Sequence, residues 1–373
     1  MNPRTYFPLG KAQGDAFCNR EAETKWLINN IESSKHSLLM APRRFGKTSL
    51  AERAIEKSGV SAIHLNFNTC ADDKDIENII RKGVSTLITK TFGPIETGIN
   101  TIKHFLKHFN PKINLGTEYA SLELMPTIDS SPISNIEESL ILMEKLLANK
   151  KKRAALLLDE FQVVGLISKG SGVEAAIRNV MQGMKHLSIV FSGSNRGLLK
   201  LMFEDNKRPL YKLCRKLHLP RIEIEHYQKY INHVSRISWG KELEKIVFDQ
   251  IMNLSERHPY YVNYLCDVIW AEYQTLPTKN QIDSAWLQVI EEERSDAQNE
   301  ITNLSMGQKK ALKYLANYSG DNVLSAHSVA TTEMALSSLF GALSSLTEKD
   351  IIEKENNHYR IINPIIRYLL RFN

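Results

Sequence analysis

A chain of 373 residues with 42% hydrophobic and 24% charged residues is long enough for two or three folded domains. The net charge of +6 and the pI near 8.9 permit contact with nucleic acid but do not by themselves indicate it. The N-terminal residues lack the apolar run of a signal peptide, no apolar stretch reaches the length of a membrane span, and the four cysteines have no metal-ligand spacing. We therefore expect a soluble, cytoplasmic protein with reduced thiols and no membrane contact.

Strands and helices alternate in the first part of the chain. Apolar residues at helical spacing predict a helix over 21–34, and an apolar strand over 37–40 follows it. A helix from 48 to about 57 then leads into a strand over 62–67. Strand–helix–strand order implies a parallel sheet covered by helices, so we expect an α/β fold.

The alternation continues to about residue 222. The segment 74–108 has a helical pattern, and two alternating runs within 109–126 predict a β-hairpin inserted in the core domain. Two further helix–strand pairs follow, with helices at 135–149 and 172–185 and strands at 154–158 and 187–192. The predicted core domain spans 1–222.

The C-terminal part is predicted to be mainly helical. Residues 223–300 form an all-α domain with helices at 224–236, 241–254, 259–273 and 280–299. Residues 301–373 have the pattern of a winged helix-turn-helix: helices at 306–317, 324–331 and 333–347, then strands at 351–353 and 359–361 joined by a turn at Asn356-Asn357.

A phosphate-binding loop connects the strand over 37–40 to the next helix. Its residues are Ala41-Pro42-Arg43-Arg44-Phe45-Gly46-Lys47-Thr48-Ser49. Backbone N–H groups at a helix N-terminus bind anions, the lysine reaches the outer phosphates of ATP, and the hydroxyl of Thr48 ligates Mg²⁺. Ala41 stands where the pattern usually has glycine, which has easier access to positive φ.

A second acidic motif follows the buried strand 154–158. Ligands bind at the carboxyl edge of such a sheet, where Asp159 and Glu160 are expected to lie. We expect Asp159 to hold Mg²⁺, largely through water, and Glu160 to polarise the water that attacks the γ-phosphate. An acidic strand end in solvent is the alternative for an isolated motif, and the pairing with Lys47-Thr48 favours the catalytic role.

Polar residues after the strand 187–192 are candidates for sensing the γ-phosphate. Ser194 and Asn195 follow this strand, which we expect beside the phosphate loop; an ordinary polar turn is equally consistent with the sequence. Arg43 and Arg44 could contact a phosphate, a neighbouring subunit or solvent.

The most basic segment is 196–221, with eight Lys or Arg and two acidic residues. Two interpretations of this segment remain open. It either contacts phosphate, as an arginine finger or on a nucleic-acid backbone, or forms a solvated helix face. The presumed recognition helix at 333–347 has no Lys or Arg, although such residues usually read base edges. We therefore expect a protein-contact or packing role for this module rather than sequence-specific reading of DNA.

Five motifs in order resemble those of the archaeal-type ATPases of the STAND class, the MNS clade. Besides the phosphate loop, Leu157–Gln162 is similar to the family's second acidic motif and Phe191–Ser194 to its sensor strand. Phe17–Glu21 resembles the segment near the base, and His258–Tyr261 resembles the helical-domain motif whose proline packs near adenine. The resemblance implies that four further residues bind ATP: Phe17, Asn19, Arg20 and Pro259.

The same resemblance implies an AAA+-like core, a helical lid and a winged helix, with oligomers in many members. The chain departs from the family at Ala41 and at Lys212-Leu213, where Gly-Arg is usual; Arg215 is left as a substitute arginine finger. Glu256-Arg257 replaces small residues before the His-Pro pair, which implies a stiffer hinge.

The leading hypothesis is an ATP-binding and ATP-hydrolysing molecular switch that acts on a partner protein or by self-association. One alternative is a DNA-engaging ATPase of a mobile-element, replication or defence system, in which the segment 196–221 and the winged helix hold nucleic acid. The other is a nucleotide-bound interaction module with negligible turnover.

Overall fold

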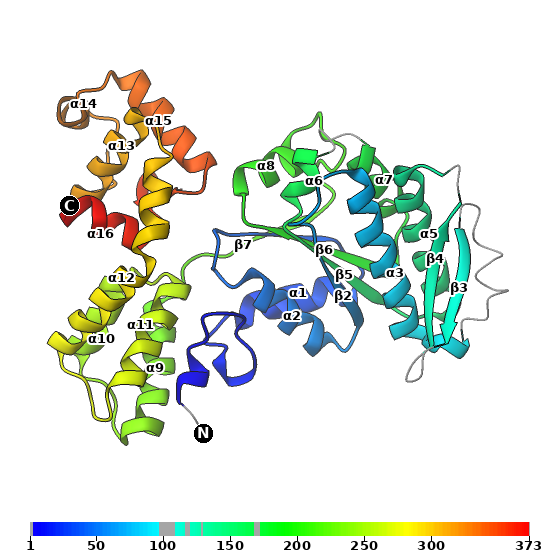
Figure 1. Cartoon of the computed structure of the whole chain (residues 1–373), viewed down its shortest axis with the longest axis horizontal. Coiled ribbons are helices and arrows are strands. Elements are labelled where there is room, and N and C mark those ends of the chain that lie inside the picture. The colour runs from blue at the N-terminus through cyan, green and yellow to red at the C-terminus, as the bar shows by residue number, and fades with distance from the viewer. Residues whose placement is uncertain (1–2, 97–108, 116–119, 128–129, 168–171, 373) are drawn as a thin grey trace. The chain divides into compact units, whose positions relative to one another are not determined.

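The computed structural model of the chain divides into two units (Figure 1). The helical unit contains the described residues of 1–20, 42–46 and 220–373, and the sheet unit those of 21–41 and 47–219. The predicted division at residues 222 and 300 into three domains stays a prediction. The structure describes residues 3–96, 109–115, 120–127, 130–167 and 172–372.

A parallel sheet forms the centre of the sheet unit, as predicted, and it has five strands. Its strand order is β2-β5-β6-β1-β7. The strands are β1 (Ser37–Met40), β2 (Ser61–Asn66), β5 (Ala154–Asp159), β6 (Leu187–Gly193) and β7 (Arg215–His218). Every residue of β1, β5 and β6 is buried, which explains their nearly continuous apolar sequences.

Alternate residues of these strands pack into two different hydrophobic clusters. Leu156 and Leu158 of β5 face one cluster, and Leu157 between them faces the other, because successive side chains on a strand point to opposite faces. Helices α1 (Glu21–Glu32) and α2 (Lys47–Ser58) contribute to the cluster of Leu157. The opposite cluster contains residues of α3 (Asp73–Glu96), α5 (Pro132–Lys150), α6 (Gln162–Ile167), α7 (Gly172–Met181) and α8 (Arg196–Glu204).

The predicted hairpin is confirmed as a separate antiparallel sheet of β3 (Phe109–Leu115) and β4 (Ala120–Pro126). Arg81 of α3 donates to the carbonyl of Leu124 at 2.6 Å, which fixes β4 against that helix. The predicted helix over 74–108 is described only as far as Glu96; residues 97–108 lie outside the described part of the chain.

Several short elements were not predicted from the sequence. The edge strand β7 has the polar sequence Arg-Lys-Leu-His and is largely exposed, so it lacks the apolar pattern of its neighbours. Helices α6, α8 and α16 (Pro364–Phe372) were also missed, because each has nine residues or fewer and therefore shows little helical periodicity.

The helical unit begins with two 3₁₀ turns, η1 (Pro3–Tyr6) and η2 (Gly14–Ala16). The four predicted helices of its middle part are present. They are α9 (Ile224–Trp239), α10 (Lys245–Ser255), α11 (Pro259–Glu272) and α12 (Lys279–Thr302). Among the described residues, no helix combines the length and the hydropathy needed to cross a membrane.

Three helices and a hairpin follow α12 in the predicted order. They are α13 (Met306–Asn317), α14 (Ala326–Thr332), α15 (Leu336–Glu348), β8 (Ile352–Glu355) and β9 (His358–Ile361). Asn356 and Asn357 both have positive φ, 47° and 66°, as a two-residue hairpin turn requires. Helix α15 begins three residues later than predicted, because Glu333 ends α14 in a left-handed conformation. The assignment as a winged helix-turn-helix stays a prediction.

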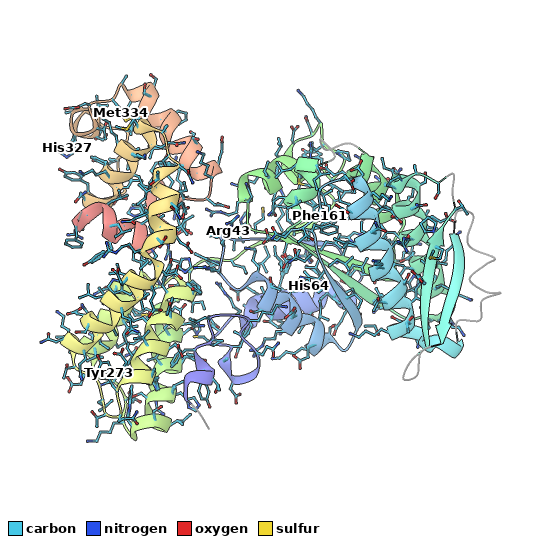
Figure 2. All side chains as sticks on the ribbon, in the orientation of Figure 1. Arg43, His64, Phe161, Tyr273, His327 and Met334 are labelled. Carbon is cyan, nitrogen blue, oxygen red and sulfur yellow. The ribbon has the colours of Figure 1, made fainter. Side chains whose placement is uncertain are left out.

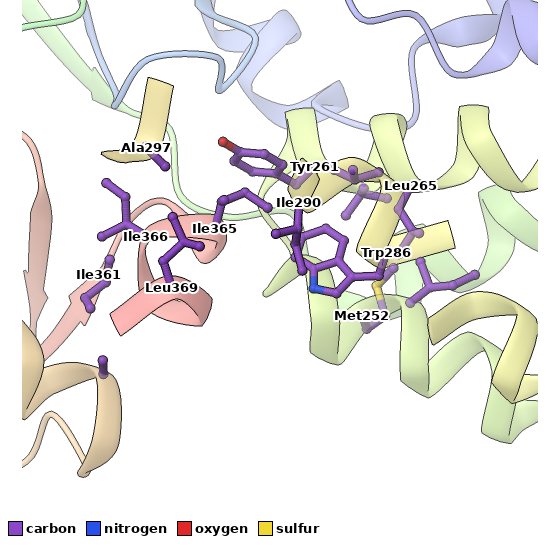
Figure 3. Packing of buried hydrophobic residues seen from close by; sticks show 14 of the residues in the cluster. Met252, Tyr261, Leu265, Trp286, Ile290, Ala297, Ile361, Ile365, Ile366 and Leu369 are labelled. Atoms are coloured by element: carbon purple, nitrogen blue, oxygen red, sulfur yellow. The ribbon is translucent and has the colours of Figure 1, made fainter. Parts of the chain in front are cut away.

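One hydrophobic cluster extends through the whole helical unit. Figure 3 shows Trp286 and Ile290 of α12 near Ile365 of α16. The long helix α12 therefore shares its core with both the middle helices and the C-terminal module.

Candidate nucleotide site

The five strands of the sheet end at the same edge because they are parallel. Met40 of β1 pairs with Gly193 of β6, and Asn66 of β2 pairs with Asp159 of β5. The expectation that β6 lies beside the strand of the phosphate loop is thereby confirmed. The chain segments at the ends of β1, β5 and β6 carry the residues predicted to bind phosphate, hold the metal and sense the γ-phosphate. These three sets of residues therefore lie at the carboxyl edge of one sheet.

The phosphate loop has two left-handed residues, Arg44 with φ 62° and Gly46 with φ 83°. Ala41 is not one of them, so the missing first glycine causes no backbone strain there. The amino group of Lys47 donates to the carbonyl of Ala41 at 2.9 Å and is largely buried. This side chain is therefore folded back over its own loop.

Gly46→Ala is expected to disturb this loop, because a left-handed conformation costs an L-residue roughly 1–2 kcal/mol. The variant should lose about that much unfolding free energy and bind ATP more weakly than the parent. Gly341→Ala in the exposed interior of α15 is the control and should gain up to ~1 kcal/mol, because its φ is helical. Equal shifts of Tm in both variants would contradict the role assigned to Gly46.

Asp159 accepts hydrogen bonds on both carboxylate oxygens. Its Oδ2 receives the hydroxyl of Thr48 at 2.9 Å and lies 3.2 Å from Nε2 of His64. Its Oδ1 accepts the hydroxyl of Ser192 and, at 3.1 Å, the backbone N–H of Glu160. Burial raises the pKa of Asp159, but the hydrogen bonds outweigh burial and hold this pKa well below its usual value. The carboxylate is therefore ionised and fixed in orientation.

Thr48 and Asp159 fit a Mg²⁺ ion. Mg²⁺ prefers oxygen ligands, and a hydroxyl beside an ionised carboxylate would supply them directly or through a water molecule. Thr48 Oγ1 and Asp159 Oδ2 lie 2.9 Å apart. Among the described residues no group of three or more His, Cys, Asp or Glu side chains could hold a metal alone. A Mg²⁺ ion here would take its remaining ligands from phosphates and water, as this ion commonly does.

His64 was not identified from the sequence. Figure 2 shows it on β2, and its ring bridges Asp159 and Glu52, with 3.2 Å to an oxygen of each. A lone histidine on a strand gives no motif, and only the pairing of β2 with β5 brings it to the acidic motif. His64 helps to orient Asp159.

Glu160 has a left-handed φ of 54° and directs its carboxylate toward β6. Oε2 accepts the hydroxyl of Ser194 at 2.8 Å and the amide of Gln162 at 2.5 Å. The side chain of Asn195 accepts the backbone N–H of Leu198 and caps α8. The structure thus brings Ser194 to Glu160, whereas Asn195 makes a capping contact; the sensing role of each stays a prediction.

Residues 42–46 of the phosphate loop contact α11 and α12 within the helical unit. Arg44 donates to Glu293 at 3.1 Å, and its guanidinium lies 4.1 Å from the ring centre of Tyr260. The ring of Phe45 packs edge-to-face on His258 at 4.8 Å. Arg43 is exposed at the tip of this loop (Figure 2). These contacts connect the loop to the two helices.

The remaining predicted ATP-binding residues lie in two segments of the helical unit. Phe17 and Asn19 follow η2, and Arg20 donates to the carbonyl of Pro220 at 2.6 Å. Pro259 is the first residue of α11. Their predicted contacts with the nucleotide stay predictions.

At least four of the eight basic residues in 196–221 make internal contacts. Arg208 pairs with the buried Glu174, and Lys216 with Glu204. Arg215 donates to Asn30 at 2.9 Å. Arg221 pairs with Glu353 at 2.9 Å inside the helical unit. The sequence interpretation as a phosphate-binding or solvated surface omitted Glu174, Asn30 and Glu353, which are distant in sequence.

Residues 17–275 match the family described as an ATPase domain predominantly from Archaea. A comparison with curated protein sequences found no match. The solved structure of a Walker-type ATPase of Pyrococcus abyssi is similar over 98% of this chain and 99% of its own, with 17% identity and a TM-score of 0.68. The ORC2 protein of Aeropyrum pernix, in ADPNP–ADP complexes, is similar over 98% and 95%, with 12% identity and a TM-score of 0.57. The chain therefore belongs to this predominantly archaeal family of ATPase domains, and it has the AAA+-like fold of a P-loop NTPase.

Proposed function

We propose that this protein is a molecular switch of the STAND class that binds ATP with Mg²⁺, hydrolyses it slowly, and transmits the nucleotide state to a partner protein or to a second copy of the chain. The proposal includes a cytoplasmic location, where cysteine thiols stay reduced. The arrangement of Thr48, Asp159 and Glu160 at one sheet edge carries it.

Each of these residues has a distinct task in hydrolysis. Lys47 binds the outer phosphates by charge, and Thr48 and Asp159 hold the metal that neutralises charge developing on them. Glu160 accepts a hydrogen bond from the attacking water and then takes its proton. Asp159 is ionised and held by four donors, so it is suited to the metal. Glu160, the next residue, has a left-handed backbone conformation, which directs its carboxylate away from Asp159 and toward Ser194.

Contacts of Arg44 support the coupling of nucleotide state to the helices. This residue belongs to the phosphate loop, and its partner Glu293 also accepts the hydroxyls of Tyr260, at 2.9 Å, and Tyr261, at 3.4 Å. A change in the loop on ATP binding would therefore act directly on α11 and α12. Both helices belong to the same unit as residues 42–46.

Glu293→Ala is expected to weaken ATP binding by about three- to tenfold, because Arg44 then loses the partner that fixes its left-handed conformation. Glu291→Ala on the same helix removes an exposed carboxylate that pairs with Arg294, and it should leave the Kd unchanged. Calorimetry with Mg-ATP measures both. Equal Kd values for the two variants would contradict the proposed coupling between the phosphate loop and α12.

Turnover and assembly test the proposed switch together. The parent should release phosphate from ATP, and light scattering should show a change of mass, alone or with a co-purified protein, between ADP and a non-hydrolysable ATP analogue. Binding without any phosphate release would instead support the interaction module. A mass independent of nucleotide, with and without that protein, would refute the switch.

The DNA-engaging alternative has weaker support. At least four of the eight basic residues in 196–221 make internal contacts, and α15 contains neither Lys nor Arg. If DNA is bound through phosphates, its affinity should fall steeply with salt and DNA should stimulate turnover.

A further inference from the structure

The segment after β5 is anchored by one aromatic residue. Phe161 is fully buried between Phe67 and Phe191, with ring centres 5.9 and 4.6 Å away, and Figure 2 shows it at the sheet. Its backbone N–H donates to the carbonyl of Ser192 at 3.0 Å. The residues on either side of Phe161, Glu160 and Gln162, therefore start from a fixed backbone.

Gln162 is seated against a glycine of β6. Its side chain is largely buried, and a Cβ atom added to Gly193 would lie only 1.9 Å from Oε1 of the amide. Any larger residue at position 193 would thus displace the amide. Among the described residues, Oε1 of Gln162 is one of the buried side-chain atoms without a hydrogen-bond partner. Burial of Oε1 without a partner is energetically unfavourable, but Nε2 of the same amide donates to Glu160 at 2.5 Å.

Two donors meet on one oxygen of Glu160. Oε2 accepts from Gln162 and, at 2.8 Å, from Ser194. Both of these hydrogen bonds end on Oε2, and among the described residues no hydrogen bond ends on Oε1 of Glu160. Donors from two directions fix the rotation of the carboxylate and leave Oε1 as the oxygen that can receive a water.

We infer that Gln162 is a positioning residue for ATP hydrolysis, which rests on the proposed function. Gln162 holds Glu160 so that Oε1 accepts the attacking water. In the reaction the water oxygen bonds to the γ-phosphorus, the bond from phosphorus to the bridging oxygen breaks with its electron pair leaving on ADP, and a water proton passes to Oε1. Gln162 itself touches neither water nor phosphate.

A role through Glu160 has a specific kinetic signature. Loss of Gln162 leaves Ser194 as the remaining donor from these two, and the carboxylate can then turn away from the water. The chemical step slows, whereas ATP binding stays the same, because the amide of Gln162 hydrogen-bonds to Glu160 and not to the phosphate loop. A merely structural role would instead change Tm and Kd along with kcat.

The test uses Gln162→Met in the full-length protein, because methionine has a similar length and no amide donor. We expect kcat to fall about tenfold, with KM and the calorimetric Kd for Mg-ATP unchanged within about twofold. Gln162→Asn is the second variant, in case the methionine variant folds poorly. Its amide is one methylene too short to reach Glu160, so kcat should fall while KM and Kd stay unchanged. Gln182→Met, at an exposed glutamine after α7, is the control and should behave as the parent.

A double variant decides whether Gln162 acts through Glu160. In a Glu160→Gln background, adding Gln162→Met should cause no further loss of kcat, because effects of residues that act as a unit do not add. A parent-like kcat in Gln162→Met, or a full tenfold loss on the Glu160→Gln background, overturns this inference alone. No turnover in the parent overturns the proposed function and the inference with it.

Discussion

Glu160→Gln is expected to lower kcat for ATP hydrolysis at least about a hundredfold while the Kd for Mg-ATP changes less than about threefold. The amide has the shape of the carboxylate and can still accept from Gln162 and Ser194. It cannot take a proton from water, so only the chemical step is lost. Phosphate release and calorimetry on the same preparation separate the two quantities.

The control for this variant is Glu56→Gln, which makes the same change on the exposed side of α2. It should have the kcat of the parent. If Glu160→Gln hydrolyses ATP at the parent rate, Glu160 is not the base and another group activates the water.

Asp159→Asn is expected to abolish the dependence of ATP turnover on Mg²⁺ and to lower kcat by a hundredfold or more, since a metal supplies roughly several kcal/mol of charge stabilisation. The change removes the charge but keeps much of the hydrogen bonding. The new amide oxygen can accept from Ser192 and from the N–H of Glu160, and the NH₂ can donate to Thr48. The unfolding free energy should therefore fall by only about 1–2 kcal/mol.

Asp159→Leu separates charge from hydrogen bonding, because it also leaves the N–H of Glu160 without its acceptor. This variant should be less stable than Asp159→Asn. Asp249→Asn on α10 serves as the control for an acid-to-amide change. Turnover with normal Mg²⁺ dependence in Asp159→Asn would show that the metal is held elsewhere.

Apolar strands and short motifs made the α/β fold and much of the candidate site predictable. The strand 154–158 consists of alanine and leucine, and a strand buried on both faces needs such a sequence. Lys47 and Asp159 are recognisable because each follows such a strand. Parallel pairing then brings their segments to one edge without further information.

Residues that act through long-range pairing could not be predicted. His64 reaches Asp159 only because β2 and β5 pair in a register that no local pattern reveals. Gln162 was recognised as part of a family motif, but its contact with Glu160 depends on the space left by Gly193.

Local rules were also misleading at two places. Ala41 was counted against the phosphate loop, yet the left-handed positions are Arg44 and Gly46. The edge strand β7 carries Arg215 and Lys216, and these charges gave no strand pattern in the sequence. Such charges are tolerated because β7 pairs with one neighbour, β1, and is largely exposed. In both cases the deciding feature was backbone geometry: the φ angles of the phosphate loop and the pairing of β7 with β1.

We expect above all that Lys47 would bind the triphosphate of ATP, and Asp159 its Mg²⁺, at the carboxyl edge of the sheet. Calorimetric titration of the parent and of Lys47→Ala with Mg-ATP tests it most directly, with circular dichroism to confirm that both are folded. We predict saturable binding by the parent and at least a tenfold weaker Kd for the variant, the equivalent of about 1.4 kcal/mol. No heat from the parent, or equal Kd values for the two proteins, would contradict the account.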